Sequence, residues 1–173
     1  MRRCSIHLKR CISASRRPWP RFAPDSAHAT TFSSAALIGR LGSDPRWETL
    51  LAVAPDSAIT SRNWPSRLRR IRQGDGDLGR RMQRLIEEAP AGPVLVIGSD
   101  IPGVTATVIA RAFKLLRSHV AVLGPASDGG FWLVGHARRR PVAEMFQSVR
   151  WSSPHTLEDT LANLTGLKVE LAD

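Results

Sequence analysis

Short apolar runs alternate along the chain with segments in which apolar residues recur every three or four positions. The unbroken runs suit strands that are covered on both faces, and the recurring positions suit amphipathic helices. Strands are predicted over residues 49–53, 68–71, 94–97, 119–123 and 167–171, with a further apolar strand from residue 131, and helices are predicted to start near residues 78, 106, 141 and 154. Asp77, Thr105 and Ser153 are the predicted N-caps. Strands that alternate with helices predict an α/β fold with a mostly parallel sheet.

An acidic residue follows the most apolar of these strands. Residues 94–97 are all aliphatic, and the first charged group after them is Asp100, directly after Gly98 and Ser99. In open α/β sheets, ligands bind in the crevice outside the carboxyl ends of the strands. Aspartate is also a common turn former and helix cap. This stretch alone therefore leaves both a functional and a plain turn role open for Asp100.

A second acidic turn follows the next predicted strand. Asp128 stands in a glycine-rich segment, residues 124–130, between two apolar runs. Magnesium is typically held by one or two carboxylates together with substrate phosphates. We therefore expect Asp100 and Asp128 to lie at neighbouring strand ends, where they would share a divalent cation.

Glycines also precede the helix that begins after Asp77. Gly74 and Gly76 would let backbone amides approach a ligand at the positive end of a helix dipole, as anion sites do. The spacing matches neither the Walker phosphate loop nor the dinucleotide fingerprint. A phosphate site and an ordinary glycine-rich loop with its cap both remain open interpretations.

The net charge of +10 is typical of nucleic-acid binding only if the basic residues lie on the folded domain, and most of the excess charge lies near the N-terminus. Seven of the ten excess positive charges come before residue 25, which leaves +3 for the rest of the 173 residues. We therefore expect no nucleic-acid partner, since that would need a basic stripe on the folded domain. No apolar stretch approaches the roughly 20 residues that span a bilayer, so no membrane association is expected. Both cysteines, Cys4 and Cys11, lie in the basic segment and suit a reducing cytoplasm.

The domain prediction follows from this charge distribution. Residues 1–30 contain three prolines and no periodic pattern, so they are expected to form an irregular basic arm. Residues 31–173 are expected to form a single domain with one substantial core.

Other chemistries find little support in the residue pattern. No serine sits in a nucleophile elbow, and the five histidines are scattered, which disfavours zinc. His136 follows the strand after Asp128 and could reach the rim of the crevice, but no role is based on it. Trp132 and Trp151 are either core residues or stacking surfaces for a base or sugar, and packing is the better default.

Four motifs in order resemble one bacterial family. It is the glycosyltransferase family associated with radical-SAM and selenodomain proteins, a branch of the nucleotide-diphospho-sugar transferase superfamily near the 2-phospho-L-lactate guanylyltransferases. The resemblance runs from residue 45 to residue 171. The motifs are QGDGDLGRRM (73–82), IGSDIPG (97–103), GPASDGGFWLVG (124–135) and VRWS (149–152).

The resemblance implies a GT-A-like, Rossmann-like α/β/α sandwich that binds a nucleotide and a divalent metal at the carboxyl ends of its strands. Asp100 would then be a catalytic residue that holds Mg²⁺ or Mn²⁺, and Asp128 would be a second ligand or would orient the acceptor. A metal that bridges phosphate oxygens neutralises charge on the leaving group. Gly74, Gly76, Asp77 and Ser99 would lie near the nucleotide.

The chain departs from that family at its start. Members begin with a strand and a loop of the type Pro-Gly-Arg-x-Lys-Thr-Arg-Leu, whereas residues 15–22 here keep arginines without the glycine and lysine. The N-terminal strand and phosphate loop are therefore expected to be missing or degenerate.

The favoured function is a metal-dependent transferase that moves a sugar from a nucleotide sugar to a small-molecule acceptor. Nucleotidyl transfer from a nucleoside triphosphate, of the phospholactate guanylyltransferase type, is the first alternative. A catalytically inactive nucleotide-binding remnant is the second.

Overall fold

The computed structural model describes residues 5–11, 39, 41–62, 64–98, 101, 103–138, 142 and 144–172, the first segment by its backbone alone. Seven strands, three α-helices and one short 3-10 helix have defined bounds in this part of the chain. In chain order they are β1 (Ser5–Cys11), β2 (Glu48–Ala54), η1 (Asp56–Thr60), β3 (Arg69–Arg72), α2 (Leu78–Glu87), β4 (Val94–Gly98), α3 (Ala106–Leu115), β5 (Ala121–Pro125), β6 (Phe131–His136), α4 (Thr156–Ala162) and β7 (Val169–Leu171).

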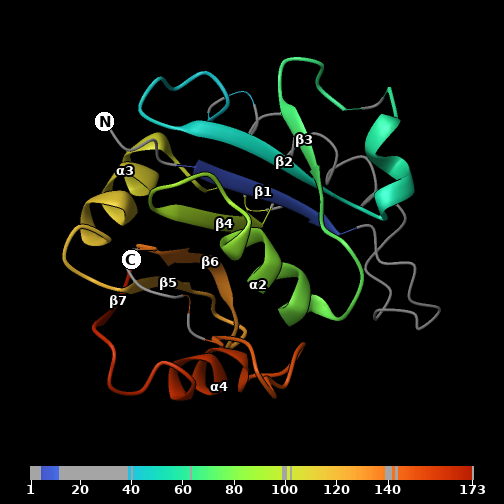
Figure 1. The fold of residues 1–173 in the computed structure, drawn as a ribbon. Helices are drawn as coiled ribbons and strands as arrows, with labels where there is room; N and C mark the ends of the chain where they lie inside the picture. Colours follow the sequence, from blue (N-terminus) through green and yellow to red (C-terminus); the bar gives the residue numbers. More distant parts are fainter. Residues whose placement is uncertain are drawn as a thin grey trace.

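The strands form one sheet in the order β3-β2-β1-β4-β6-β5-β7 (Figure 1). All pairs are parallel except those that β6 makes with β4 and β5. The predicted mostly parallel sheet is confirmed, and β6 is inserted between β4 and β5. The carboxyl ends of the other six strands therefore share one edge of the sheet with the β5–β6 turn.

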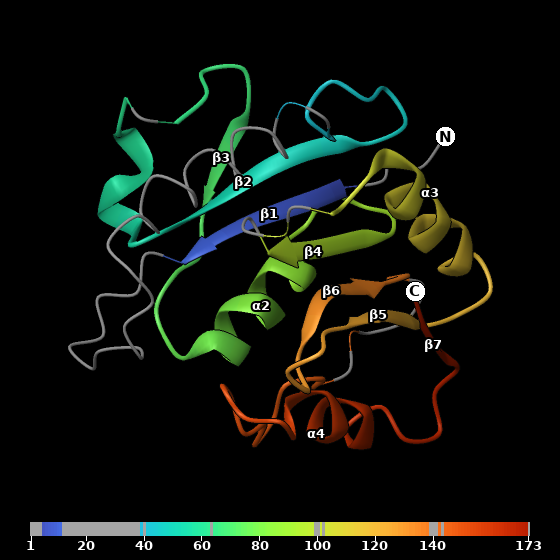
Figure 2. The same cartoon turned by 180° about the vertical axis from the view of Figure 1, so that it is seen from behind.

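Helices cover both faces of this sheet, which makes three layers. Along β4, Leu95 and Ile97 belong to one apolar cluster, and Val94 and Val96 belong to the other. This alternation is that of a strand buried on both sides. Helix α3 packs on the first face, and α2 and α4 pack on the second (Figures 1 and 2).

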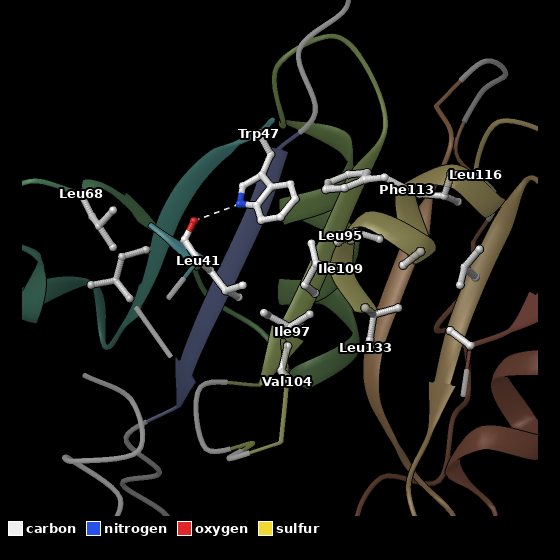
Figure 3. Close-up of a cluster of buried hydrophobic side chains, with 14 of the residues drawn as sticks. Leu41, Trp47, Leu68, Leu95, Ile97, Val104, Ile109, Phe113, Leu116 and Leu133 are labelled. Atoms are coloured by element: carbon white, nitrogen blue, oxygen red, sulfur yellow. Dashed lines mark hydrogen bonds between the residues drawn. The ribbon is translucent and has the colours of Figure 1, made fainter. Parts of the chain in front are cut away.

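The cluster on the α3 face closes one side of the sheet (Figure 3). The Trp47 and Phe113 rings lie 6.0 Å apart, and the Trp47 indole N–H donates to the Leu41 carbonyl at 3.0 Å. The buried indole therefore keeps a polar partner, as buried tryptophans usually do. Ile97 lies in the same cluster, one residue before the end of β4.

Two predicted caps fix where helices begin beside the shared edge. The Asp77 carboxylate accepts from the Arg80 amide at 2.8 Å, and the Thr105 hydroxyl accepts from the Val108 amide at 3.3 Å. Each satisfies one of the free amides of a first helical turn. Helices α2 and α3 therefore start at the residues that the sequence pattern predicts.

The expectation of a missing first strand was wrong. Strand β1 lies between β2 and β4 and pairs in parallel with both, from Ser5↔Glu48 to Cys11↔Ala54 on one side. The prediction of an irregular arm is therefore wrong for residues 5–11. The basic residues in this segment obscure the strand pattern, and the strand forms because β2 and β4 pair with it on either side. Residues 12–38, with the expected phosphate-loop region 15–22, lie outside the described residues.

Two predicted helix starts near the C-terminus were also wrong. Residues 145–148 form a turn, and α4 begins at Thr156 rather than at Pro154. The predicted Ser153 cap was also wrong: the Ser153 hydroxyl donates to the Arg150 carbonyl and accepts from the His155 amide, which makes a turn before the helix, and the N-cap is His155. No helix in the described part of the chain is long and apolar enough to cross a membrane.

Candidate functional site

A cleft of about 530 Å³ opens where β4 ends beside the β5–β6 turn. Four segments meet there: the start of α2, the end of β4 with Ile101, the β5–β6 hairpin, and the segment 151–156 that leads into α4. In open α/β sheets, ligands bind at this edge, outside the carboxyl ends of the strands. Its lining residues are Leu78, Met82, Val96, Ile97, Gly98, Ile101, Ala126, Asp128, Gly130, Phe131, Trp132, Val134, Trp151, Ser152, Ser153, Pro154 and Thr156.

One wall of the cleft is a fixed aromatic group. The Trp151 ring lies 6.3 Å from Phe131, edge-on, and 5.9 Å from Phe146. A Cβ added to Gly79 would lie 2.9 Å from Phe146 and 3.0 Å from the Trp151 indole. Helix α2 thus has no room for a side chain at position 79, and Trp151 is held in place while it stays part-exposed.

Trp132, which follows Phe131 on β6, forms the other wall of the cleft. Trp132 packs with the α3-face cluster, whereas Phe131 packs with the other cluster, so the two rings stand on opposite faces of the sheet. The Trp132 indole lies against Gly124, where an added Cβ would come within 2.5 Å of it. The cleft therefore has an indole on each side of the sheet edge.

Asp128 stands exposed in the turn between these strands. One of its carboxylate oxygens accepts from the Gly130 amide at 2.9 Å, and the Ala126 amide donates to the Gly130 carbonyl at 3.0 Å. These bonds fix the carboxylate on the turn and leave its second oxygen with no protein partner among the described residues. The second oxygen of Asp128 is thus available in the cleft as a metal ligand or as a hydrogen-bond acceptor.

The segment that carries Trp151 and Ser152 is tied to α4 by an ion pair. The Arg150 guanidinium bonds both oxygens of Asp159, at 2.9 and 2.7 Å, and the Arg150 amide donates to the same carboxylate. The Arg150 hydrogen bonds lower the pKa of Asp159 to about 2. Ser152 adopts a positive φ of 56°, which non-glycine residues rarely do and which recurs at functional sites.

The glycine loop ahead of α2 lies beside the cleft rather than in its lining. Gly74 and Gly76 have positive φ values of 74° and 106°. The Gly74 amide donates to the Asp56 carboxylate at 3.0 Å, and the Arg84 guanidinium donates to the carbonyls of Gln73 and Asp75. Gly74, Gly76 and Asp77 do not line the cleft, although the next residue, Leu78, does.

Two of the predicted site residues, Ser99 and Asp100, lie outside the described residues. The residues on either side of them, Gly98 and Ile101, both line the cleft. No group of three or more His, Cys, Asp or Glu side chains that could hold a metal occurs in the described part of the chain. Asp128 is the one carboxylate among the described residues that line the cleft.

Comparison with known proteins decides the family. Residues 37–153 match the family described as "Uncharacterized protein conserved in bacteria (DUF2064)", which is more than half of the chain. The chain belongs to the DUF2064 family. No curated protein matches it in sequence.

Solved structures show the fold of this DUF2064 protein. One is a protein from Desulfovibrio desulfuricans G20, proposed to be a nucleotide-diphospho-sugar transferase. It matches with a TM-score of 0.81 at 20% identity, and the match covers 99% of this chain and 80% of the Desulfovibrio chain. The 4-diphosphocytidyl-2C-methyl-D-erythritol synthase of Anaerococcus prevotii DSM 20548 has a TM-score of 0.56 at 10% identity, over 98% and 86% of the two chains. The expected nucleotide-diphospho-sugar transferase fold is confirmed.

One histidine of the DUF2064 protein is far from the cleft. His136 is 1% exposed at the end of β6, where it pairs with Val94 and Ala121 at the amino-terminal ends of β4 and β5. Burial, and then the positive charge of Arg138, lower the pKa of His136. Its Nδ1 accepts from the Arg138 amide at 2.9 Å. His136 is therefore a buried neutral histidine at the edge of the sheet opposite the candidate site.

Sequence reasoning missed several residues of the cleft in this DUF2064 protein. Leu78 and Met82 are four residues apart, a spacing that predicts the apolar side of a helix, but nothing in this spacing predicts that they also line a cleft. Trp132 and Trp151 were expected mainly in the core, and they pack there while they line the cleft. For Ser152 the sequence did contain a signal, because the motif VRWS includes it, but the motif by itself assigned it no role.

Proposed function

We propose that this protein is a metal-dependent transferase that uses a nucleotide-activated donor, with a nucleotide sugar as the favoured donor. The observation that carries the proposal is the cleft at the carboxyl end of β4, with the Asp128 carboxylate fixed at its rim. The fold shared with a protein proposed to be a nucleotide-diphospho-sugar transferase supports it.

The residues have separate roles in this proposal. Asp100 would hold Mg²⁺ or Mn²⁺ at the end of β4, and Gly74, Gly76, Asp77 and Ser99 would lie near the nucleotide. The cation would neutralise charge on the diphosphate leaving group. The free oxygen of Asp128 fits either of two roles: a second ligand to the cation, or an acceptor for the hydrogen of the attacking hydroxyl.

In the transfer step, the acceptor oxygen forms a bond to the anomeric carbon of the donor sugar. The bond from that carbon to the diphosphate oxygen breaks, and its electron pair leaves with the nucleoside diphosphate. The hydroxyl proton passes to Asp128 or to water. Trp151 and Trp132 would keep water from the apolar walls while the reaction takes place.

Nucleotidyl transfer is the second candidate. It is supported by the fold shared with 4-diphosphocytidyl-2C-methyl-D-erythritol synthase, whose TM-score of 0.56 is lower than that of the proposed sugar transferase relative. The two reactions release different products, since nucleotidyl transfer from a triphosphate releases pyrophosphate. Assays for nucleoside diphosphate and for pyrophosphate separate them.

Thermal unfolding of the full chain tests the proposal. Nucleoside di- and triphosphates and nucleotide sugars are each added with Mg²⁺, Mn²⁺ or a chelator. A ligand at 100 times its Kd stabilises the fold by about 2.7 kcal/mol, which is a few degrees in Tm for a domain of this size. We expect a rise in Tm that one class of nucleotide sugar produces and that the chelator removes.

Three variants sharpen this experiment. Asp100→Asn should abolish the metal-dependent rise. Asp128→Asn should abolish it if Asp128 binds the cation, and should keep the rise but lose turnover if Asp128 orients the acceptor. Glu88→Gln, at the exposed far end of α2 and outside the cleft lining, is the control and should behave as the wild type. No rise with any nucleotide would favour the alternative of an inactive remnant.

A further inference from the structure

The polar groups of the cleft are few, and most are already used. Among the described residues that line it there is no lysine, arginine or histidine. The Thr156 hydroxyl donates to the Arg150 and Ser153 carbonyls, and the Ser153 hydroxyl is held in the turn before α4. Among the described side chains of the lining, the polar atoms that remain for a ligand are the second oxygen of Asp128 and the hydroxyl of Ser152.

This inventory indicates the charge of the ligand that the cleft favours. A phosphate or carboxylate on the acceptor would meet a like charge beside Asp128, because the described lining supplies no cation and the proposed divalent ion would lie on the diphosphate of the donor. A neutral hydroxyl would instead donate to the Asp128 oxygen. Such a bond to a charged acceptor is among the stronger hydrogen bonds in proteins.

The walls indicate the shape of that ligand. Trp132 and Trp151 flank the cleft from opposite faces of the sheet, and Phe131, Leu78 and Met82 extend the apolar surface next to Trp151. Aromatic rings favour flat partners in stacked or edge-on contact. Trp151 is held by Phe131 and Phe146, so little side-chain freedom is lost when a ligand contacts it.

We propose that this cleft binds the acceptor of the transfer reaction, and that the acceptor is an uncharged hydroxyl compound with an aromatic face. The inference rests on the proposed function, because it assigns the acceptor of that same reaction. The aromatic face lies against Trp151, and the hydroxyl points to Asp128 and Ser152.

Three probes test the inference on the full chain by saturation-transfer NMR titration. Phenyl β-D-glucoside has an aromatic face and neutral hydroxyls, methyl β-D-glucoside lacks the ring, and phenyl phosphate has the ring with a negative charge. We expect phenyl β-D-glucoside to bind with a Kd at least about 10-fold lower than either of the others, as stacking and charge repulsion each contribute. Equal or tighter binding of phenyl phosphate would overturn the inference.

Variants assign the contacts. Trp151→Leu should raise the Kd for phenyl β-D-glucoside about 5-fold, and Trp151→Phe, which keeps a ring in the aromatic group, should raise it less. Asp128→Asn should lower the Kd for phenyl phosphate by removing the like charge. Leu171→Ala, at the 42% exposed residue of β7 outside the cleft, is the control and should change neither value. If Trp151→Leu does not fold, the Trp151→Phe and Asp128→Asn results decide, and unchanged binding in both would overturn the assignment.

The result is independent of the donor experiment. Metal-dependent nucleotide binding with no preference for phenyl β-D-glucoside would overturn the acceptor inference and leave the proposed function standing. A preference for phenyl β-D-glucoside with no nucleotide binding would overturn the proposed function, and with it the cleft's assignment as an acceptor site.

Discussion

Single side chains decide where the elements around the cleft begin and how closely they approach. Asp77 ends the glycine loop and starts α2, so that the next residue, Leu78, faces the cleft. At position 79 the absence of a side chain lets Trp151 and Phe146 pack directly on the first turn of the helix. The cap and the glycine together determine how far the aromatic wall lies from α2.

Replacing the cap should destabilise the fold. Asp77→Ala removes the carboxylate that accepts from the Arg80 amide, and loss of an N-cap costs about 1 kcal/mol. Asp75→Ala, two residues earlier and exposed, should stay within about 0.5 kcal/mol of the wild type. Urea unfolding of both variants measures the difference, and equal losses would contradict the cap.

The buried histidine should make stability depend on pH. The pKa of His136 is lowered in the fold, so its contribution is present above the ordinary histidine pKa, near 6.5, and is lost as the pH falls below it. His136→Asn keeps an oxygen that can accept from the Arg138 amide but does not titrate. We expect the difference in unfolding free energy between wild type and variant to shrink from pH 7.5 to pH 5.5. Parallel curves from urea titrations would contradict this.

At the scale of elements, the β5–β6 hairpin and the segment before α4 build the cleft by packing on each other. The Leu157 amide in the first turn of α4 donates to the Gly129 carbonyl at 2.9 Å. Gly129 has a φ of 83°, and a Cβ there would lie 2.2 Å from the Pro154 carbonyl oxygen. This contact explains why α4 begins at Thr156, since the hairpin supplies an acceptor that the helix would otherwise lack at its start.

A side chain at Gly129 should separate these two elements. Gly129→Ala forces a positive φ and a backbone clash, and we expect a loss of about 2 kcal/mol or more with a lower Tm. Gly103→Ala, where no atom of the described residues lies within 4 Å of the added carbon, is the control and should leave Tm close to that of the wild type. Both are measured by thermal unfolding. A Gly129→Ala protein as stable as Gly103→Ala would contradict the contact.

At the scale of the whole molecule, β1 joins the two halves of the sheet. It pairs with β2 on one side and with β4 on the other, so the first described strand lies inside the sheet and not at its edge (Figure 1). Among the described strands, β1 alone connects the β3-β2 pair to the β4-β6-β5-β7 part. The candidate cleft, at the end of β4, depends on this central pairing.

Removal of the first strand should therefore prevent cooperative folding. A chain that begins at residue 12 loses both ladders of β1 and exposes the apolar edges of β2 and β4, so we expect insoluble protein or a broad, non-cooperative unfolding transition. A chain that begins at residue 5 keeps the strand and is the control. Solubility and the shape of the thermal transition are the measurements, and a sharp wild-type transition without β1 would contradict its place in the sheet.

Much of the fold was predictable because local patterns carry it. The aliphatic run 94–97 and the caps Asp77 and Thr105 depend on neighbours within a few residues, and all three are as expected. Strand β1 was missed because the strands that it pairs with, β2 and β4, lie more than 35 residues away in the sequence. Its own mixture of basic and apolar residues does not produce a clear strand pattern.

The sequence by itself determined the α/β class, the position of most strands and helices, and Asp128 as a carboxylate in a glycine-rich turn, because residue spacing and turn chemistry act locally. Only the tertiary structure decided the strand order, with β6 between β4 and β5, and the meeting of Leu78, Trp132, Trp151 and Asp128 around one cleft. These arrangements depend on contacts between segments far apart in the chain. The free energy of burying their shared apolar surface selects one arrangement, and no short window of sequence contains that information.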